Sequence, residues 1–126
     1  MLLDTHAVPW VFGDPAKLGR DARRILEACD PEEIAICDFS LYELAILLDR
    51  GRIRVSLPAS RVLEEISSRI TVVPLDASIA WEAARLALPQ GDPFDRVIVA
   101  TARRYHLPLI TKDAMILASK LVKTIW

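Results

Sequence analysis

The stretch from Gly91 to Ala102 reads Gly-Asp-Pro-Phe-Asp-Arg-Val-Ile-Val-Ala-Thr-Ala. It predicts a helix that begins after Asp92, because aspartate is a favoured N-cap and proline suits the first helical position. Ile98 and Val99 follow Asp95 at three and four positions, so all three lie on the face that turns toward a core. A carboxylate at the edge of a buried face is costly unless a partner neutralises it.

Two interpretations of this stretch remain open from its residues alone. Asp92 and Asp95 have the spacing of an N-cap and its third helical residue, as in a capping box, and acidic residues favour a first turn. Alternatively, Asp95 is a metal ligand. That second interpretation requires other carboxylates that reach the same place.

Length and composition limit the number of domains and the classes of function that the chain can have. At 126 residues the chain is expected to be one domain, 1–126, and 52% hydrophobic residues suffice for a well-filled core. A net charge of −1 gives the chain no overall attraction for nucleic acid, so binding of nucleic acid would require a local basic patch. Cys29 and Cys37 lie in apolar surroundings without metal-ligand spacing, which favours buried thiols. With neither a leader nor a membrane-spanning run in this sequence, we expect a cytoplasmic protein.

Apolar runs alternate with helical patterns along the chain. Strands are predicted at 1–4, 34–37, 70–75, 107–111 and 121–125, and helices at 7–12, 18–29, 39–50, 58–69, 76–88, from 92 onward and, briefly, from 113. This alternation predicts an α/β fold with a parallel sheet covered on both faces. Sites in such sheets lie beyond the carboxyl ends of the strands.

Four acids occupy positions that fit this rule. Asp4 and Asp113 each follow an apolar strand, Asp95 lies in the first turn of a core helix, and Glu43 interrupts the apolar stripe of another helix. A turn or cap explains either strand-end aspartate alone, but a glutamate within an apolar stripe is seldom buried without a partner. Four converging carboxylates need a cation to remain ionised, and oxygen-only ligands suit Mg²⁺ or Mn²⁺. Acidic sites of this kind carry out phosphoryl-transfer chemistry, in which a metal-activated water attacks a phosphodiester.

The ordered motifs Asp4-Thr-His-Ala, Ser40-Leu-Tyr-Glu43, Asp92-Pro-Phe-Asp95-Arg-Val-Ile-Val-Ala and Leu109-Ile-Thr-Lys-Asp113 resemble those of the PIN-domain family. More narrowly, they resemble the toxin ribonucleases of VapBC toxin–antitoxin modules, and the likeness spans essentially the whole chain. One departure is Gly91, where many relatives place a basic residue.

The resemblance implies a three-layer α/β/α fold with a roughly five-stranded parallel sheet. It implies a Mg²⁺- or Mn²⁺-dependent endoribonuclease that leaves 5′-phosphate and 3′-hydroxyl ends. Asp4, Glu43 and Asp95 become the core metal-binding and catalytic acids, with Asp113 the fourth. A homodimer and a small antitoxin that blocks the site are implied as partners.

Several further residues are candidates for supporting roles. Thr111 can bond an acid or a metal-bound water, and Asp92 is a cap first and a supporting group second. Arg96 and Lys112, with Arg103 and Arg104 nearby, form the best local patch for RNA phosphates, although a solvated helix face or an ion pair explains them too. His6 is more simply structural than a general base. Four aromatic residues are predicted in the core or at interfaces, with no platform for stacking bases: Trp10, Phe12, Trp81 and Phe94.

Two other functions compete with the nuclease. A catalytically silent PIN-type domain would only bind RNA or a protein. A receiver-like phosphoacceptor domain shares acids at strand ends and a lysine after a late strand, here Lys112, but it wants a second acid beside Asp4, where Thr5 and His6 stand. An NTPase is disfavoured because the chain has no phosphate-binding glycine-rich loop.

Overall fold

The computed structural model describes residues 1–88 and 92–126. Five parallel strands form one sheet in the order β3-β2-β1-β4-β5. They are β1 (Leu2–Leu3), β2 (Ala35–Cys37), β3 (Thr71–Val73), β4 (Leu109–Ile110) and β5 (Thr124–Ile125). The predicted parallel α/β sheet is confirmed.

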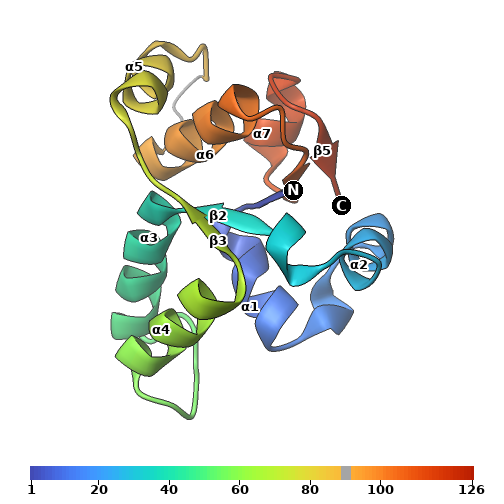
Figure 1. Cartoon of the computed structure of the whole chain (residues 1–126), viewed down its shortest axis with the longest axis vertical. Helices are drawn as coiled ribbons and strands as arrows, with labels where there is room; N and C mark the ends of the chain where they lie inside the picture. Colours follow the sequence, from blue (N-terminus) through green and yellow to red (C-terminus); the bar gives the residue numbers. More distant parts are fainter. Residues whose placement is uncertain (89–91) are drawn as a thin grey trace.

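Helices cover both faces of the sheet (Figure 1). One layer holds α1 (Val8–Phe12), α2 (Arg20–Glu27), α3 (Asp38–Asp49) and α4 (Ala59–Arg69), and the other holds α5 (Ala77–Arg85), α6 (Pro93–Arg104) and α7 (Ala114–Ser119). Short 3₁₀ turns lie at Thr5–Ala7, Pro15–Lys17 and Pro31–Glu33. The three-layer arrangement expected from the sequence is therefore present.

Alternation along the strands divides the core in two. Leu2 and Leu109 belong to the apolar cluster that includes α6, whereas Leu3 and Ile110 belong to the cluster on the opposite face. All four side chains are fully buried. Because successive strand residues point to opposite faces, two-residue strands suffice to join the helix layers.

Most predicted elements are present but shorter than expected. Strand 70–75 is reduced to β3, because Pro74 lacks the N–H that would continue the ladder. Pro108 likewise precedes β4 within the predicted 107–111. The helix expected over 76–88 ends at Arg85, and the one expected over 7–12 is α1, which begins at Val8 after a 3₁₀ turn over Thr5–Ala7. Gly91, the one departure from the family pattern, lies outside the described residues.

Aspartates begin the helices near the carboxyl edge of the sheet, as predicted. Asp92 accepts a hydrogen bond from the Phe94 N–H at 3.0 Å and caps α6, and Asp76 caps α5 in the same way. Gly51 follows α3 with φ +65°, the left-handed conformation that glycine adopts at little cost. Both cysteines are free thiols. No helix within the described residues is long and apolar enough to cross a membrane.

The strand order places a switch point at the centre of the sheet. The chain builds β2 and β3 on one side of β1 and later builds β4 and β5 on the other side. The carboxyl ends of β1 and β4 therefore adjoin at the point where the order reverses, which is where open α/β sheets bind ligands. Asp4 follows β1, and Thr111 to Asp113 follow β4.

Candidate active site

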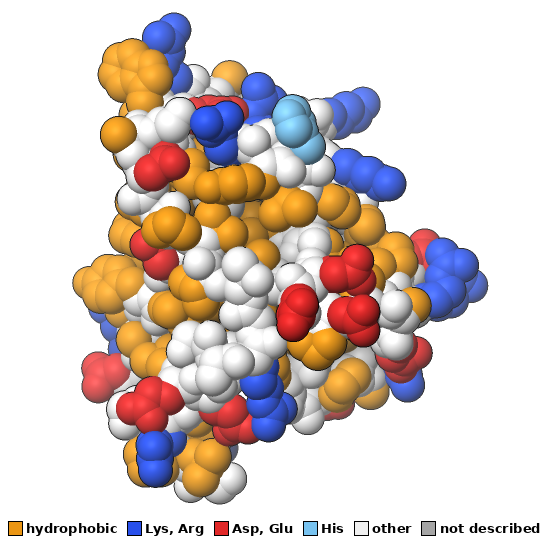
Figure 2. Space-filling model, viewed as in Figure 1, with side chains coloured by type: hydrophobic (Ala, Val, Ile, Leu, Met, Phe, Trp, Pro, Cys, Tyr) orange, Lys and Arg blue, Asp and Glu red, His pale blue; other side chains and the backbone are white. Residues whose placement is uncertain are grey.

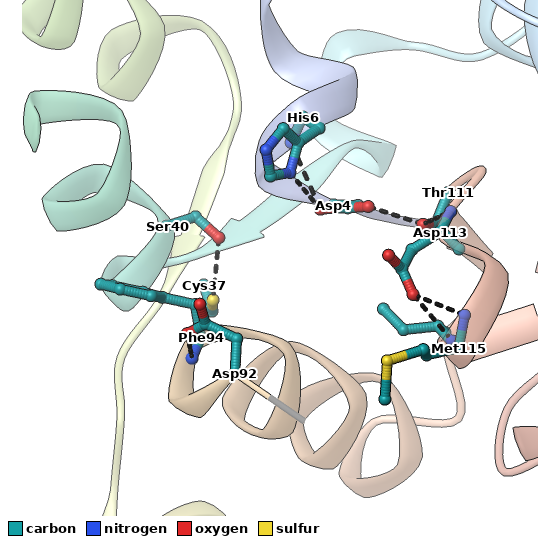
Figure 3. A network of polar contacts seen from close by, with 10 residues as sticks. Asp4, His6, Cys37, Ser40, Asp92, Phe94, Thr111, Asp113 and Met115 are labelled. Atoms are coloured by element: carbon teal, nitrogen blue, oxygen red, sulfur yellow. Dashed lines mark hydrogen bonds and ion pairs between the residues drawn. The ribbon is translucent and has the colours of Figure 1, made fainter. Parts of the chain in front are cut away.

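Asp4 is a buried carboxylate held from two directions. Its side chain sits directly after β1, and the residue is 3% exposed. Its Oδ1 accepts from the His6 backbone N–H at 3.2 Å, and its Oδ2 accepts from the Thr111 hydroxyl at 2.5 Å (Figure 3). Thr111 follows β4 and is itself fully buried. The two central strands thus orient this acid across the switch point.

Asp113 joins the same network through Thr111. The Asp113 backbone N–H donates to Thr111 Oγ1 at 3.0 Å (Figure 3). Asp113 Oδ1 accepts from the N–H groups of Met115 and Ile116, both at 2.9 Å, and so caps α7. Both capping bonds use Oδ1, and the other carboxylate oxygen points away from α7 in Figure 3. Asp113 is therefore the predicted cap and also a neighbour of Asp4.

Asp95 lies in the first turn of α6 and is half-buried. Burial, followed by the negative charges of Asp113, Asp4, Asp92 and Glu43, raises the pKa of Asp95 from 3.8 to about 7. These four carboxylates therefore lie close enough to Asp95 for their charges to act on it. The structure thus brings together the acids that the sequence places far apart.

Glu43 projects from α3 toward the same group. Burial raises its pKa, and Asp4 and Asp92 add to this effect, whereas the Thr5 hydroxyl and His6 favour the charged form. The Thr5 hydroxyl is buried without a hydrogen bond of normal geometry to the described residues. The Thr5 hydroxyl therefore lies near Glu43 and favours its charged form, although the two do not form a hydrogen bond of normal geometry.

Aromatic packing fixes the two helices that carry Glu43 and Asp95. Phe39 on α3 and Phe94 on α6 stack with their ring centroids 4.7 Å apart, and Tyr42 lies 6.1 Å from Phe94. Such stacking adds to the area that the rings bury. It holds the first turn of α6 against α3, which sets the relative positions of the two acids.

His6 lies at the edge of the acidic group. Its Nδ1 is 3.7 Å from Asp4 Oδ1, and its side chain is 60% exposed. Hydrogen bonding of the imidazole to the Asp4 carboxylate raises the pKa of His6, and the charges of Asp4, Glu43 and Asp95 add to that shift. A raised pKa keeps the imidazole protonated to higher pH, which makes it a poorer general base at neutrality.

The chemistry of the donors fits a hard divalent cation. The four acids offer only oxygen, and their mutual repulsion falls when a cation binds. No three His, Cys, Asp or Glu side chains in residues 1–88 and 92–126 are spaced as a ready-made metal-binding group. Mg²⁺ does not require one, since it keeps several waters and often takes only one or two carboxylates from the protein.

The shifted pKa of Asp95 predicts a pH-dependent stability in the absence of divalent cations. Its pKa is 3.8 in the unfolded chain and about 7 in the folded protein, so the folded state holds this proton more tightly. Its contribution to the free energy of unfolding therefore declines as the pH rises from 3.8 to about 7. We expect a decline of the order of 1 kcal/mol, because solvent screens a half-buried group.

Urea unfolding in EDTA across this pH range measures the effect. Asp95→Asn should gain stability relative to the parent as the pH rises, whereas the exposed control Asp21→Asn should follow the parent. A constant difference between the parent and Asp95→Asn would contradict the assignment.

Arg96 has a different role from the predicted phosphate contact. Its Nη1 donates to the carbonyls of Leu86 at 2.8 Å and Ala83 at 3.4 Å, and its Nη2 donates to Leu88 at 2.7 Å. It thus satisfies backbone acceptors at the carboxyl end of α5, where helical carbonyls lack partners. The expected ion pair with an acid is replaced by bonds to these carbonyls.

The rest of the predicted basic patch is also dispersed. Arg103 Nε pairs with Glu82 Oε1 at 2.6 Å, and Lys112 Nζ lies 4.4 Å from the centre of the Trp10 ring. The Trp10 ring also packs against Trp126, with the centroids 5.4 Å apart. Trp126 was not among the residues singled out from the sequence, because no local pattern links it to Trp10.

A groove of about 760 Å³ lies away from the acids. Its lining includes Arg104 and His106, which precede β4, and Lys123, which immediately precedes β5. The groove is therefore at the amino ends of these strands. Figure 2 shows Lys and Arg side chains at the end of the molecule formed by α5, α6 and α7. This groove occupies the opposite edge of the sheet from Asp4 and is not part of the candidate active site.

Comparison with known proteins identifies relatives of this architecture. The model of the PIN domain family matches residues 1–119. The chain is 35% identical over 116 residues to Ribonuclease VapC22 of Mycobacterium tuberculosis, which covers 90% of this chain and 86% of that protein.

Two solved structures share the fold. The structure of VapBC2 from Rickettsia felis bound to a promoter DNA fragment aligns with a TM-score of 0.71 at 19% identity, over 99% of this chain and 97% of the other. A toxin–antitoxin complex from Klebsiella pneumoniae aligns with a TM-score of 0.69 at 21% identity, over 99% and 95%.

Proposed function

We propose, since this chain belongs to the PIN-domain family, that it is a metal-dependent endoribonuclease and the toxin of a toxin–antitoxin module. The observation that carries the proposal is the Asp4–Thr111–Asp113 network at the switch point of the sheet. Burial and the charges of Asp113, Asp4, Asp92 and Glu43 raise the pKa of Asp95, which places that carboxyl near the same network. Perturbed carboxyl groups of this kind gather at functional sites. The relative named Ribonuclease VapC22 supports RNA as the substrate.

Asp4, Glu43, Asp95 and Asp113 would hold the cation in this proposal. When bound, Mg²⁺ or Mn²⁺ supplies the Lewis-acid charge that activates water and offsets the negative charge that develops on a phosphodiester. The protein positions these ligands in advance: Thr111 holds Asp4 at 2.5 Å, and α7 holds the Asp113 carboxylate through its capping bonds. Preset ligand directions reduce the reorganisation that catalysis requires.

The same proposal extends to partners and location. The solved structures that share the fold include a toxin–antitoxin complex and a VapBC2 complex bound to DNA, which supports a small antitoxin as a partner of this chain. We further propose a homodimer and a cytoplasmic location, both of which follow from the resemblance to VapC-type toxins.

A receiver-like phosphoacceptor is less compatible with the topology. The flavodoxin-like sheets that include receiver domains have the order 2-1-3-4-5, whereas this sheet has the order β3-β2-β1-β4-β5. A catalytically silent PIN domain shares the fold and differs only in activity. The nuclease assay distinguishes that alternative.

The test is cleavage of a panel of transfer, ribosomal and messenger RNAs by the purified protein. We expect cleavage with Mg²⁺ or Mn²⁺, 5′-phosphate and 3′-hydroxyl ends on the products, and loss of activity in EDTA that added Mg²⁺ restores. Undiminished cleavage in EDTA would overturn the metal-dependent mechanism. Binding of RNA without cleavage, under any of these metals, would favour the silent domain.

A further inference from the structure

Lys112, Trp10 and Trp126 meet beside the acids and form what we call the indole–lysine cluster. Lys112 Nζ lies 4.4 Å from the centre of the Trp10 ring and 5.9 Å from that of Trp126. The two rings pack edge-on, at an interplanar angle of 67°. Lys112 follows β4 and Trp126 follows β5, so both lie at the edge of the sheet that carries Asp4.

The position of the Lys112 head group is informative. Lys112 stands between Thr111, which bonds Asp4, and Asp113, yet it forms no ion pair with any acid in the described part of the chain. Its ammonium instead lies over an aromatic face, and the side chain is exposed. A cation–π contact leaves ammonium N–H donors available to another acceptor.

The indole rings are held in place while part of each stays accessible. Trp10 and Trp126 are both half-buried. Trp126 lies against Gly19, where even the Cβ of an alanine would collide with the Trp126 backbone and ring. Glycine at this position therefore allows the close approach that seats the Trp126 ring. The cluster is a fixed aromatic surface with a cation on it.

We propose that the indole–lysine cluster is a subsite for a nucleotide of single-stranded RNA next to the cleaved bond. The Lys112 ammonium binds its phosphate, and the indole rings contact its base. Every base has a π face that stacks on aromatic side chains, and single-stranded RNA exposes those faces. A cation at the rim also offsets the repulsion between the acidic pocket and the RNA backbone. The subsite rests on the proposed nuclease function, whose substrate class it narrows.

Binding measured without cleavage tests the subsite separately from the enzyme. Asp95→Asn prevents turnover, and Trp81→Phe leaves Trp10 and Trp126 as the two tryptophans of this chain. An oligouridylate labelled with fluorescein is titrated in Mg²⁺ at several salt concentrations, with anisotropy as the readout. Unlabelled oligouridylate is titrated in parallel while tryptophan fluorescence is recorded.

We expect the oligouridylate to quench the tryptophan fluorescence. Trp126→Leu should weaken binding about tenfold, the size expected for loss of one base–aromatic contact. Lys112→Met should lower the slope of log affinity against log salt by about 0.7, the share of one phosphate contact on a single strand. Lys123→Met, at the opposite edge of the sheet, is the matched control and should retain the slope.

Absence of quenching, or equal salt slopes for Lys112→Met and Lys123→Met, would overturn the subsite even if the parent protein cleaves RNA. If Trp126→Leu fails to fold, the salt slope of Lys112→Met still tests the subsite, because Lys112 is exposed and its substitution should leave the fold intact. Quenching and a reduced slope, combined with no cleavage by the protein that retains Asp95, would instead uphold binding of single-stranded RNA by the cluster and overturn the nuclease, and with it the placement beside a cleaved bond.

Discussion

Asp4→Asn should reduce the rate of RNA cleavage at saturating Mg²⁺ by at least about a thousandfold. The substitution keeps the shape of a side chain that is 3% exposed and removes the charge that would face the cation. The amide oxygen can still accept from the His6 N–H, and the Thr111 hydroxyl can accept from the amide group. The fold is therefore retained while the cation loses a ligand.

Single-turnover cleavage rates measured across a Mg²⁺ titration check this expectation, with thermal unfolding as the control for folding. Asp14→Asn removes one charge from a surface pair with Lys17 and should cleave like the parent. Parent-like rates for Asp4→Asn with an unchanged Mg²⁺ requirement would remove Asp4 from the ligand set. Comparable losses in Asp14→Asn would point to the overall charge of the protein.

Arg96→Met should lower the free energy of unfolding by about 3 kcal/mol. Its guanidinium donates to three backbone carbonyls, those of the buried Ala83, of Leu86 and of the buried Leu88. Hydrogen bonds from a charged donor are the stronger kind, and methionine leaves all three acceptors without it. The loss should loosen the contact between α5 and α6 near the turn that carries Asp95.

Chemical unfolding of the metal-free protein measures this effect. Arg104→Met is the matched control, because Arg104 lies on the same helix but is exposed, and it should change stability by no more than about 0.5 kcal/mol. Equal stabilities of the two variants would contradict the role assigned to Arg96. Arg96→Lys should recover part of the loss, since lysine keeps the charge without the planar fork.

Local chemistry was sufficient to predict the parts of the candidate site that lie at chain turns. Asp92 and Asp113 were predicted as caps because aspartate accepts from the first N–H groups of a helix, and the structure confirms both. Glu43 stood out because it interrupts an apolar stripe. Its half-buried position among other acids agrees with that reasoning.

Contacts between distant segments were less predictable. Arg96 looked like a surface cation, because its three carbonyl partners lie in a segment that periodicity assigned to a longer helix. Lys112 looked like part of an arginine patch, yet its head group turns to Trp10. The predicted strands were too long for a related reason. Apolar residues that pack in the core continue past the last backbone hydrogen bond between strands, so an apolar run is longer than the strand within it.

The sequence by itself determined the alternation of strands and helices, the caps and the presence of acids after β1 and β4, because each depends on neighbours within a few residues. Only the tertiary structure decided that Asp95 and Glu43 approach Asp4, and that Trp126 closes over Trp10 beside Lys112. These positions depend on the strand order and on how the helices pack against the sheet. Both result from many weak contacts between residues that are far apart in the chain. The raised pKa of Asp95 follows from this packing, since burial and the charges of Asp4, Glu43 and Asp113, which come from three other segments, act on one carboxyl group only after folding.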